Sequence, residues 1–225
     1  REELGGICLN WGCIPTKALL KSANVFDYIN HAEDYGIKIK GAEVDFPAIV
    51  KRSRDVAAGM SNGIQFLMKK NKIDVIVGTG KLKVGKKIDV TDDAGKVTEY
   101  AAKNIVIATG TRSRVLPSLP QDGKKIIGYR DAMVLPELPK KMVVVGSGAI
   151  GSEFAYLYNS MGVEVTIVEF LPNLIPLEDE EVSKQFARSF KKSGIKVMVN
   201  SSVESVDTSG TGCKVLVKTK KGEET

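Results

Sequence analysis

The spacing of apolar residues in the first third of the chain predicts two helices. Over 14–34 the apolar side chains recur at the spacing of one helix face, as at Ile14, Ala18, Val25 and Ile29. A second helical pattern covers 46–70. It follows Asp45, a residue type that caps helix N-termini, and Pro47 falls in the first turn, where its missing N–H costs nothing.

From residue 73 the pattern changes to that of β-strands. Short runs predict strands at 73–78, 81–84, 86–91 and 97–102, and the DDAG sequence at 92–95 predicts a hairpin turn between the last two. The run AKNIVIATG at 102–110 is continuously apolar, which is typical of a strand buried on both faces. Residues 113–140 are rich in proline and show little periodicity, so we interpret them as a linker.

The last third of the chain alternates strands and helices. Strand patterns at 142–146, 163–169 and 195–200 are separated by helical patterns at 149–161 and about 179–193, and a final hairpin follows. This alternation predicts a parallel sheet covered by helices, and hence an α/β fold of three-layer, Rossmann-like form. We divide the chain into an N-terminal domain at 1–113, a linker at 114–140 and a C-terminal domain at 141–225.

Composition and charge exclude several classes of function. The chain is 43% hydrophobic, yet no apolar run approaches the roughly 20 residues that cross a bilayer, and no signal peptide is evident. The net charge of +6 comes from dispersed lysine pairs, without a recognisable nucleic-acid module. We therefore expect a cytoplasmic protein that binds neither membrane nor nucleic acid.

A glycine-rich loop at 146–151 predicts a dinucleotide site. The sequence GSGAIG matches G-x-G-x-x-G, follows a predicted strand and opens a predicted helix. The first glycine allows a tight turn, the second a close approach of the pyrophosphate, and the third close packing of helix on strand. The helix N-terminus favours the diphosphate charge. We assign this site to Gly146, Ser147, Gly148, Ala149, Ile150 and Gly151.

Glu169, at the end of the next predicted strand, indicates which nucleotide binds. Its carboxylate can accept hydrogen bonds from the adenosine ribose, whereas it would repel a 2′-phosphate. The following stretch, FLPNLIP, contains no arginine to receive such a phosphate. We therefore expect NAD(H) rather than NADP(H). The alternative is a structural strand–helix turn with a solvated glutamate.

The sequence GGICLNWGCIPTK at 5–17 contains two cysteines, Cys8 and Cys13. A zinc site needs about four ligands, but His31 is the only histidine and Cys213 is remote, in an expected buried strand, so we expect no metal site. On a straight helix, positions i and i+5 lie ~140° apart and ~7.5 Å along the axis. The segment must therefore bend for the two thiols to meet.

The two cysteines have unequal surroundings in this interpretation. Pro15 is tolerated only near a helix start, so a helix should begin at about Cys13. The positive helix N-terminus and Lys17, one turn along on the same face, favour the thiolate form of Cys13. Cys8 would lie in the preceding loop as the more mobile partner. Two inert buried cysteines remain the alternative.

Three motifs occur in an order that resembles a known family. GGICLNWGCIPTK, the strand ending in IATG, and VVVGSGAIGSE followed by Glu169 are similar to the pyridine nucleotide–disulfide oxidoreductases. Ile14 and Thr16 resemble the branch that oxidises dihydrolipoamide, whereas glutathione and mercuric reductases favour valine at the first position. The resemblance implies flavin-dependent oxidation of dihydrolipoamide to lipoamide by a Cys8–Cys13 disulfide, with FAD and NAD as cofactors. It also implies that 1–113 is a partial FAD-binding domain and 141–225 a partial NAD-binding Rossmann domain.

The resemblance also implies a role for individual residues. Cys8 would be the interchange thiol that attacks the substrate, and Cys13 the thiolate in charge-transfer contact with the flavin. Lys17 would lie near the flavin, paired with Glu153. The further cofactor contacts implied are Gly80, Thr109, Gly110 and Thr111 for FAD and Val203 for the NAD adenine.

Other features of the family have no counterpart in this sequence. These are a first FAD-binding βαβ unit, a later FAD motif, and a C-terminal dimerisation domain with a His–Glu acid/base pair. The chain opens at Arg1 rather than methionine and stops at KKGEET. We therefore expect both ends to be cut and this segment to be inactive alone.

The resemblance leaves two alternative functions and implies two partners. The alternatives are another flavin disulfide reductase, similar to glutathione or mercuric reductase, and an NAD-binding fragment without flavin. The implied partners of the intact enzyme are a second copy of itself, as a homodimer, and the lipoyl domain of a 2-oxoacid dehydrogenase complex or of the glycine cleavage system.

Overall fold

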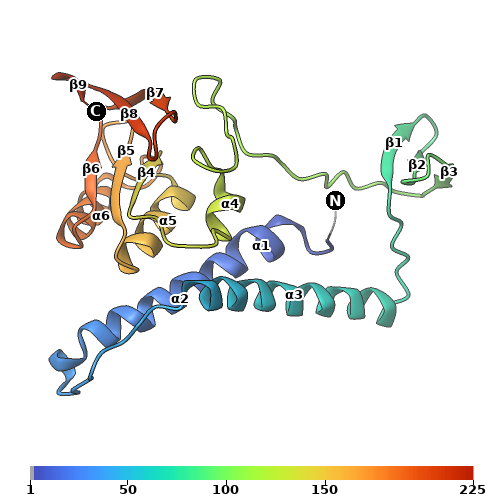
Figure 1. The fold of residues 1–225 in the computed structure, drawn as a ribbon. Helices are drawn as coiled ribbons and strands as arrows, with labels where there is room; N and C mark the ends of the chain where they lie inside the picture. The colour runs from blue at the N-terminus through green and yellow to red at the C-terminus, as the bar shows by residue number, and fades with distance from the viewer. Residues whose placement is uncertain (1–2, 225) are drawn as a thin grey trace.

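Helices form the N-terminal part of the computed structural model, which describes residues 3–224 (Figure 1). Two long helices run side by side in opposite directions, and a short helix precedes them. The capping prediction is confirmed, because the Asp45 carboxylate accepts a hydrogen bond from the Ala48 N–H at 3.0 Å. In chain order the helical elements are α1 (Gly6–Trp11), α2 (Cys13–Asn30), the 3-10 helix η1 (Ala32–Tyr35) and α3 (Phe46–Lys70).

An antiparallel sheet follows α3 and stands apart from the helices in Figure 1. Its strands are β1 (Thr79–Lys83), β2 (Lys87–Thr91) and β3 (Val97–Ala101), paired in that order. The predicted hairpin turn is confirmed, since the Asp92 carboxylate accepts hydrogen bonds from the N–H groups of Ala94 and Lys96 at 3.0 and 2.9 Å.

Two predicted strands are wrong in the described structure. Residues 73–78 and 104–110 are extended but form no strand, and their apolar side chains are largely exposed, with Val106 at 88%. A strand buried on both faces needs neighbours for its backbone groups and helices over its two faces. No segment within residues 3–224 pairs with either run, so the apolar pattern has no sheet to enter.

The parallel sheet and its helices confirm the α/β class. Strands β4, β5 and β6 pair side by side in that order, with α5 and α6 as the crossovers. Gly162 ends α5 with φ of +89°, a conformation that glycine adopts without steric cost. The bounds are β4 (Lys141–Val145), α5 (Ala149–Ser160), β5 (Glu164–Val168), α6 (Glu180–Lys192) and β6 (Lys196–Met198).

A third sheet ends the described chain. It pairs β7 (Ser202–Asp207), β8 (Lys214–Thr219) and β9 (Gly222–Glu224) antiparallel. The expectation that Cys213 is a buried strand residue is wrong. Cys213 is exposed and has a free thiol, because it belongs to the glycine-rich turn between β7 and β8 and precedes the first strand residue, Lys214.

One hydrophobic core joins the N-terminal helices to the parallel sheet. Leu19 and Ala23 of α2 are fully buried in it together with Ala155 and Tyr158 of α5. The proposed linker also enters this core, through the short helix α4 (Tyr129–Met133). Burial raises the pKa of the Tyr158 hydroxyl above its usual value, and that hydroxyl donates a hydrogen bond to the Ala132 carbonyl. Among the helices of residues 3–224, none has the length and hydropathy to cross a membrane.

We predict that Tyr158→Phe destabilises the fold by about 1–3 kcal/mol at pH 8, because the Ala132 carbonyl loses its buried donor. The raised pKa of Tyr158 means that its contribution is present below the unfolded pKa of about 10 and declines as pH rises above it. Urea unfolding should therefore show a smaller gap between wild type and variant at pH 11. An equal gap at both pH values would contradict this account. Tyr28→Phe, on the exposed face of α2, is the control and should change stability by less than about 0.5 kcal/mol.

Candidate functional site: a dithiol and a glycine loop on packed helices

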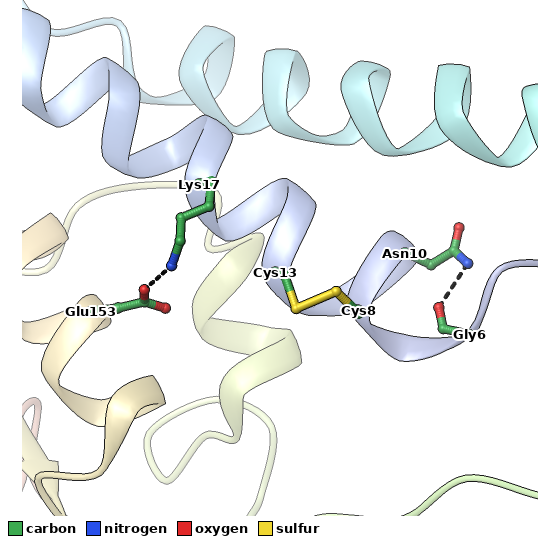
Figure 2. Close-up of a disulfide and its surroundings, with 6 residues drawn as sticks. All are labelled: Gly6, Cys8, Asn10, Cys13, Lys17 and Glu153. Atoms are coloured by element: carbon green, nitrogen blue, oxygen red, sulfur yellow. Dashed lines mark hydrogen bonds and ion pairs between the residues drawn. A yellow bond between two sulfur atoms is a disulfide. The ribbon is translucent and has the colours of Figure 1, made fainter. Parts of the chain in front are cut away.

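The two cysteines of the N-terminal motif form a disulfide at the junction of α1 and α2 (Figure 2). Their Cα atoms are 4.6 Å apart, within the range of an ordinary disulfide. As predicted from Pro15, α2 begins at Cys13. The expectation that Cys8 lies in a loop is wrong, since Cys8 is within α1. The chain bends between two helices, so both cysteines are held by regular structure.

Gly12 makes this bend possible for a steric reason. A Cβ atom at this position would lie 2.9 Å from the Ile7 carbonyl oxygen and 3.1 Å from the Cα of Cys8. Such contacts are too short for any side chain. Glycine therefore allows the bend between α1 and α2 that brings Cys13 onto Cys8.

Hydrogen bonds fix the segment between the cysteines. The Asn10 side chain is buried and donates to the carbonyls of Leu4 and Gly6, at 2.8 and 2.9 Å. The Trp11 indole N–H donates to the Glu3 carboxylate at 3.1 Å. From α3, the Arg54 guanidinium donates to the Asn10 carbonyl at 2.7 Å and lies 3.9 Å from the centroid of the Trp11 ring.

The sequence analysis missed Arg54. It lies 44 residues from Asn10 and has no motif around it. The packing of α3 against α1 brings it to the segment between the cysteines. Burial lowers the pKa of its guanidinium below the usual value, opposed by the nearby Glu3 carboxylate and assisted by Arg130. The arginine nevertheless stays charged, since its usual pKa is far above neutrality.

An ion pair connects α2 to α5, the helix that follows β4. The Lys17 ammonium of α2 meets the Glu153 carboxylate of α5, one turn of helix from Cys13 (Figure 2). The Lys17 side chain is 65% exposed and that of Glu153 30%. Exposed pairs contribute little to stability, about 0–1 kcal/mol. The pair instead holds the lysine in one direction beside the disulfide.

The glycine loop joins β4 to α5 with three differently constrained glycines. Gly146 has φ of +95°, which glycine adopts without the steric cost of a Cβ. A Cβ at Gly151 would collide with the Gly146 carbonyl, so the lack of a side chain at Gly151 allows α5 to pack against the glycine loop. A Cβ at Gly148 would meet nothing within 4 Å. Open space therefore remains over the second glycine, at the N-terminus of α5, where Ala149 is the first helical residue and Ile150 is exposed.

Glu169 is buried against this loop and acts as its anchor. Its carboxylate accepts hydrogen bonds from the Ser147 N–H at 2.8 Å, the Ser147 hydroxyl at 2.7 Å and the Leu171 N–H at 2.8 Å. An ionised carboxylate has about four acceptor positions. Three are used by the protein, which leaves one for a ligand hydroxyl. Val203, the second residue of β7, follows close by, since the Ser201 N–H donates to the Glu169 carbonyl at 3.0 Å.

The residues expected to contact FAD fall into two separate groups. Lys17 and Glu153 lie beside Cys13. Gly80 lies in β1 of the sheet that stands apart in Figure 1, and Thr109, Gly110 and Thr111 lie in the exposed extended segment after β3. Within residues 3–224, these two groups therefore lie apart and do not form one cradle for a dinucleotide.

A metal function finds no support in the arrangement of ligands. Within the part of the chain that the structure describes, no three His, Cys, Asp or Glu side chains are grouped closely enough to hold a metal ion. His31 ends α2, where its ring nitrogen lies 2.9 Å from the Asp27 carbonyl.

Comparison with known proteins agrees with the family that the sequence motifs resemble. A family model described as pyridine nucleotide-disulphide oxidoreductase matches residues 2–225. The chain is 47% identical to a dihydrolipoyl dehydrogenase of Chlorobaculum tepidum over 94% of its length and 45% of the relative's. It is 40% identical to the mitochondrial dihydrolipoyl dehydrogenase of Pisum sativum, over all of its length and 45% of the relative's.

A solved structure agrees with these relatives. The crystal structure of LpdA from Mycobacterium tuberculosis superposes with a TM-score of 0.88 at 30% identity, covering 98% of this chain and 48% of that protein. The chain thus spans about half the length of the relatives that it matches. The family resemblance of the motifs is confirmed, and the chain belongs to the pyridine nucleotide-disulphide oxidoreductase family.

Proposed function

We propose that the intact protein containing this chain oxidises dihydrolipoamide to lipoamide and transfers the electrons to NAD. One observation carries the proposal. The Cys8–Cys13 disulfide lies one turn of α2 from Lys17, and Lys17 forms an ion pair with Glu153 of α5. Helix α5 begins at the glycine loop. A thiol-exchange centre and a nucleotide loop are thus connected through two packed helices. The similarity to dihydrolipoyl dehydrogenases supports this choice of substrate.

The thiol step is an exchange between the substrate dithiol and the protein disulfide. A thiolate of dihydrolipoamide attacks Cys8 and breaks the Cys8–Cys13 bond, which forms a mixed disulfide and releases Cys13 as the thiolate. The second substrate thiol then displaces Cys8 and closes the lipoamide ring. The substrate loses two electrons and two protons. The protein gains both electrons as the Cys8 thiol and the Cys13 thiolate, so Cys8 takes up one proton and the other is released to solvent.

The position of Cys13 stabilises the charge left by this exchange. As the first residue of α2, Cys13 lies at the positive end of the helix, and the Lys17 ammonium is one turn away. Lys17 and Glu153 would hold a bound FAD on the thiolate side of Cys13, and the flavin would supply two-electron transfer between the dithiol and NAD. The chain's own contribution is to keep Cys13 charged and to direct Lys17 through Glu153.

The glycine loop and Glu169 support NAD as the acceptor. The space over Gly148 and the N-terminus of α5 fit a diphosphate. The remaining acceptor position on Glu169 fits one ribose hydroxyl, and its buried charge disfavours a 2′-phosphate. We infer further that the intact enzyme is a homodimer that accepts a lipoyl domain in the cytoplasm, as the resemblance implies.

A second candidate is a fragment that binds NAD without flavin. The observation that favours it is the separation of Gly80 and Thr109–Thr111 from the dithiol. The third candidate, another flavin disulfide reductase, shares the dithiol and differs in substrate. Steady-state rates with lipoamide and with glutathione disulfide distinguish the three candidates. If neither compound is turned over, the NAD-binding fragment is supported. If only glutathione disulfide is turned over, the third candidate is supported.

We predict that two-electron reduction of the intact protein gives a long-wavelength absorption band that Cys13→Ser abolishes. The reason is that the band requires a thiolate next to the flavin, and Cys13 is the cysteine at the α2 N-terminus. Cys8→Ser is the matched control and should retain the band. A band that survives in Cys13→Ser and disappears in Cys8→Ser would reverse the two assigned roles.

We predict that Gly148→Ala weakens NADH binding about tenfold or more while the thermal midpoint stays within a few degrees. A methyl group meets no protein atom at Gly148 but occupies the space proposed for the diphosphate. Gly151→Ala should instead lower stability by about 1–3 kcal/mol, because its methyl group collides with the loop backbone. Calorimetric titration with NADH and thermal unfolding measure the two effects. Unchanged NADH affinity in Gly148→Ala would remove the diphosphate from this loop.

We predict that Glu169→Gln narrows the preference for NAD over NADP by about tenfold, the equivalent of ~1.4 kcal/mol, since a neutral amide no longer repels a 2′-phosphate. The amide keeps the shape of the side chain, and its oxygen can still accept from Ser147, although its NH2 group cannot accept from the Leu171 N–H. The measurement is the ratio of kcat/KM for the two nucleotides. Ser147→Ala removes one hydrogen bond to Glu169 but not its charge, so it should leave the ratio within about twofold. An unchanged ratio in Glu169→Gln would contradict the ribose contact.

A further inference from the structure

Four residues connect the two redox cysteines, from Leu9 to Gly12. When the disulfide is reduced, no covalent bond holds Cys8 against Cys13, and only this segment determines how often the thiols meet. Loss of order in the segment would increase the entropy of the reduced form and disfavour ring closure. The contacts of the segment therefore influence the equilibrium between dithiol and disulfide.

Arg54 makes two contacts with this segment. Its guanidinium donates to the Asn10 carbonyl at 2.7 Å and stacks over the Trp11 ring at 3.9 Å from the centroid. Trp11 also lies under Arg130 of α4, 5.0 Å from the ring centroid. A planar guanidinium can satisfy a carbonyl and an aromatic face together, which a lysine ammonium cannot do with the same geometry.

Apolar packing leaves part of this region unfilled. A hollow of about 280 Å³ lies between α1 and α3, and polar side chains make up most of its lining, namely Glu3, Asn10, Arg54, Ser61 and Asn62 with Ala58. Because the contact between the two helices is incomplete here, directed hydrogen bonds decide the position of the segment. Figure 2 shows one of them, from Asn10 to Gly6, beside the disulfide.

We propose that Arg54 is a positioning residue for the Cys8–Cys13 pair, which holds the connecting segment in one conformation in the dithiol form and so favours reclosure of the disulfide. Arg54 acts through Asn10 and Trp11 and does not itself exchange electrons. The inference deepens the proposed redox role of this pair and rests on it.

The test is the equilibrium of the pair with dithiothreitol in the intact protein. Dithiothreitol loses two electrons and two protons to form its cyclic disulfide, and the Cys8–Cys13 bond is reduced to two thiols. Alkylation followed by peptide mapping quantifies the thiols of Cys8 and Cys13 alone. We expect Arg54→Ala to lower the equilibrium constant for disulfide formation about tenfold, which raises the reduction potential by about 30 mV.

The direction of the change in reduction potential distinguishes a positioning role of Arg54 from an effect of its charge. If Arg54 acted only by stabilising a nearby thiolate, its removal would favour the disulfide and lower the potential. Arg54→Lys retains the charge and loses the double contact, so a positioning role predicts a rise in potential for this variant as well. A fall in potential in Arg54→Ala, or a wild-type potential in Arg54→Lys, would overturn the proposal.

Arg52 provides a matched control on the same helix. Its guanidinium donates to the Ala18 carbonyl at 2.8 Å, a bond of the same kind to a residue outside the segment between the cysteines. Arg52→Ala should therefore leave the potential unchanged. Equal shifts in both variants would show a general effect of loosening α3 and would overturn the proposal. The dithiothreitol equilibrium needs neither lipoamide nor NAD, so its outcome is independent of whether the proposed turnover is found.

Discussion

Helix α2 packs on α5 through fully buried side chains, and this contact sets the distance between the two chemical centres of the chain. Leu19 and Ala23 of α2 share one core with Ala155 and Tyr158 of α5. The disulfide is at the N-terminus of α2, and the glycine loop is at the N-terminus of α5. Any shift of one helix along the other would separate Lys17 from Glu153 and change where the dithiol faces the nucleotide region.

Both centres lie at a helix N-terminus whose backbone geometry requires glycine. At Gly12 the glycine is required because the Ile7 carbonyl and Cys8 leave no room for a Cβ, and the resulting turn places Cys13 first in α2. At Gly146 the positive φ and at Gly151 the close approach produce the loop that opens α5. The first helix end favours a thiolate and the second an external diphosphate, since both ends attract negative charge.

Local patterns in the sequence predicted elements whose partners are close along the chain. The ends of α3, the α2 start at Cys13, the Asp92 turn and the β–α–β block depend on capping, proline geometry and short-range periodicity. The runs 73–78 and 102–110 have equally clear apolar patterns but no strand neighbours among the described residues, so the pattern alone gave the wrong structure. A strand needs a sheet, and that requirement is not local.

The same distinction applies to the site. Cys8, Cys13, the glycine loop and Glu169 stand in motifs, and the chemical reason for each residue type is visible in the sequence. Arg54 belongs to no sequence motif, and the packing of α3 against α1 brings it to Asn10, between the two cysteines. The three hydrogen bonds by which Glu169 anchors Ser147 and Leu171 were likewise unforeseen, because they depend on loop geometry.

In the proposed reaction, the Cys8–Cys13 pair passes electrons from a substrate dithiol to NAD. The most direct measurement is anaerobic alkylation of Cys8 and Cys13 in two samples of the intact protein, one taken after one equivalent of dihydrolipoamide and one taken after NAD is then added. Both cysteines should be alkylated in the first sample and protected in the second, and an equal concentration of NADP should give no protection. Cysteines that stay protected after dihydrolipoamide, or that NAD fails to reoxidise, would rule out this electron path.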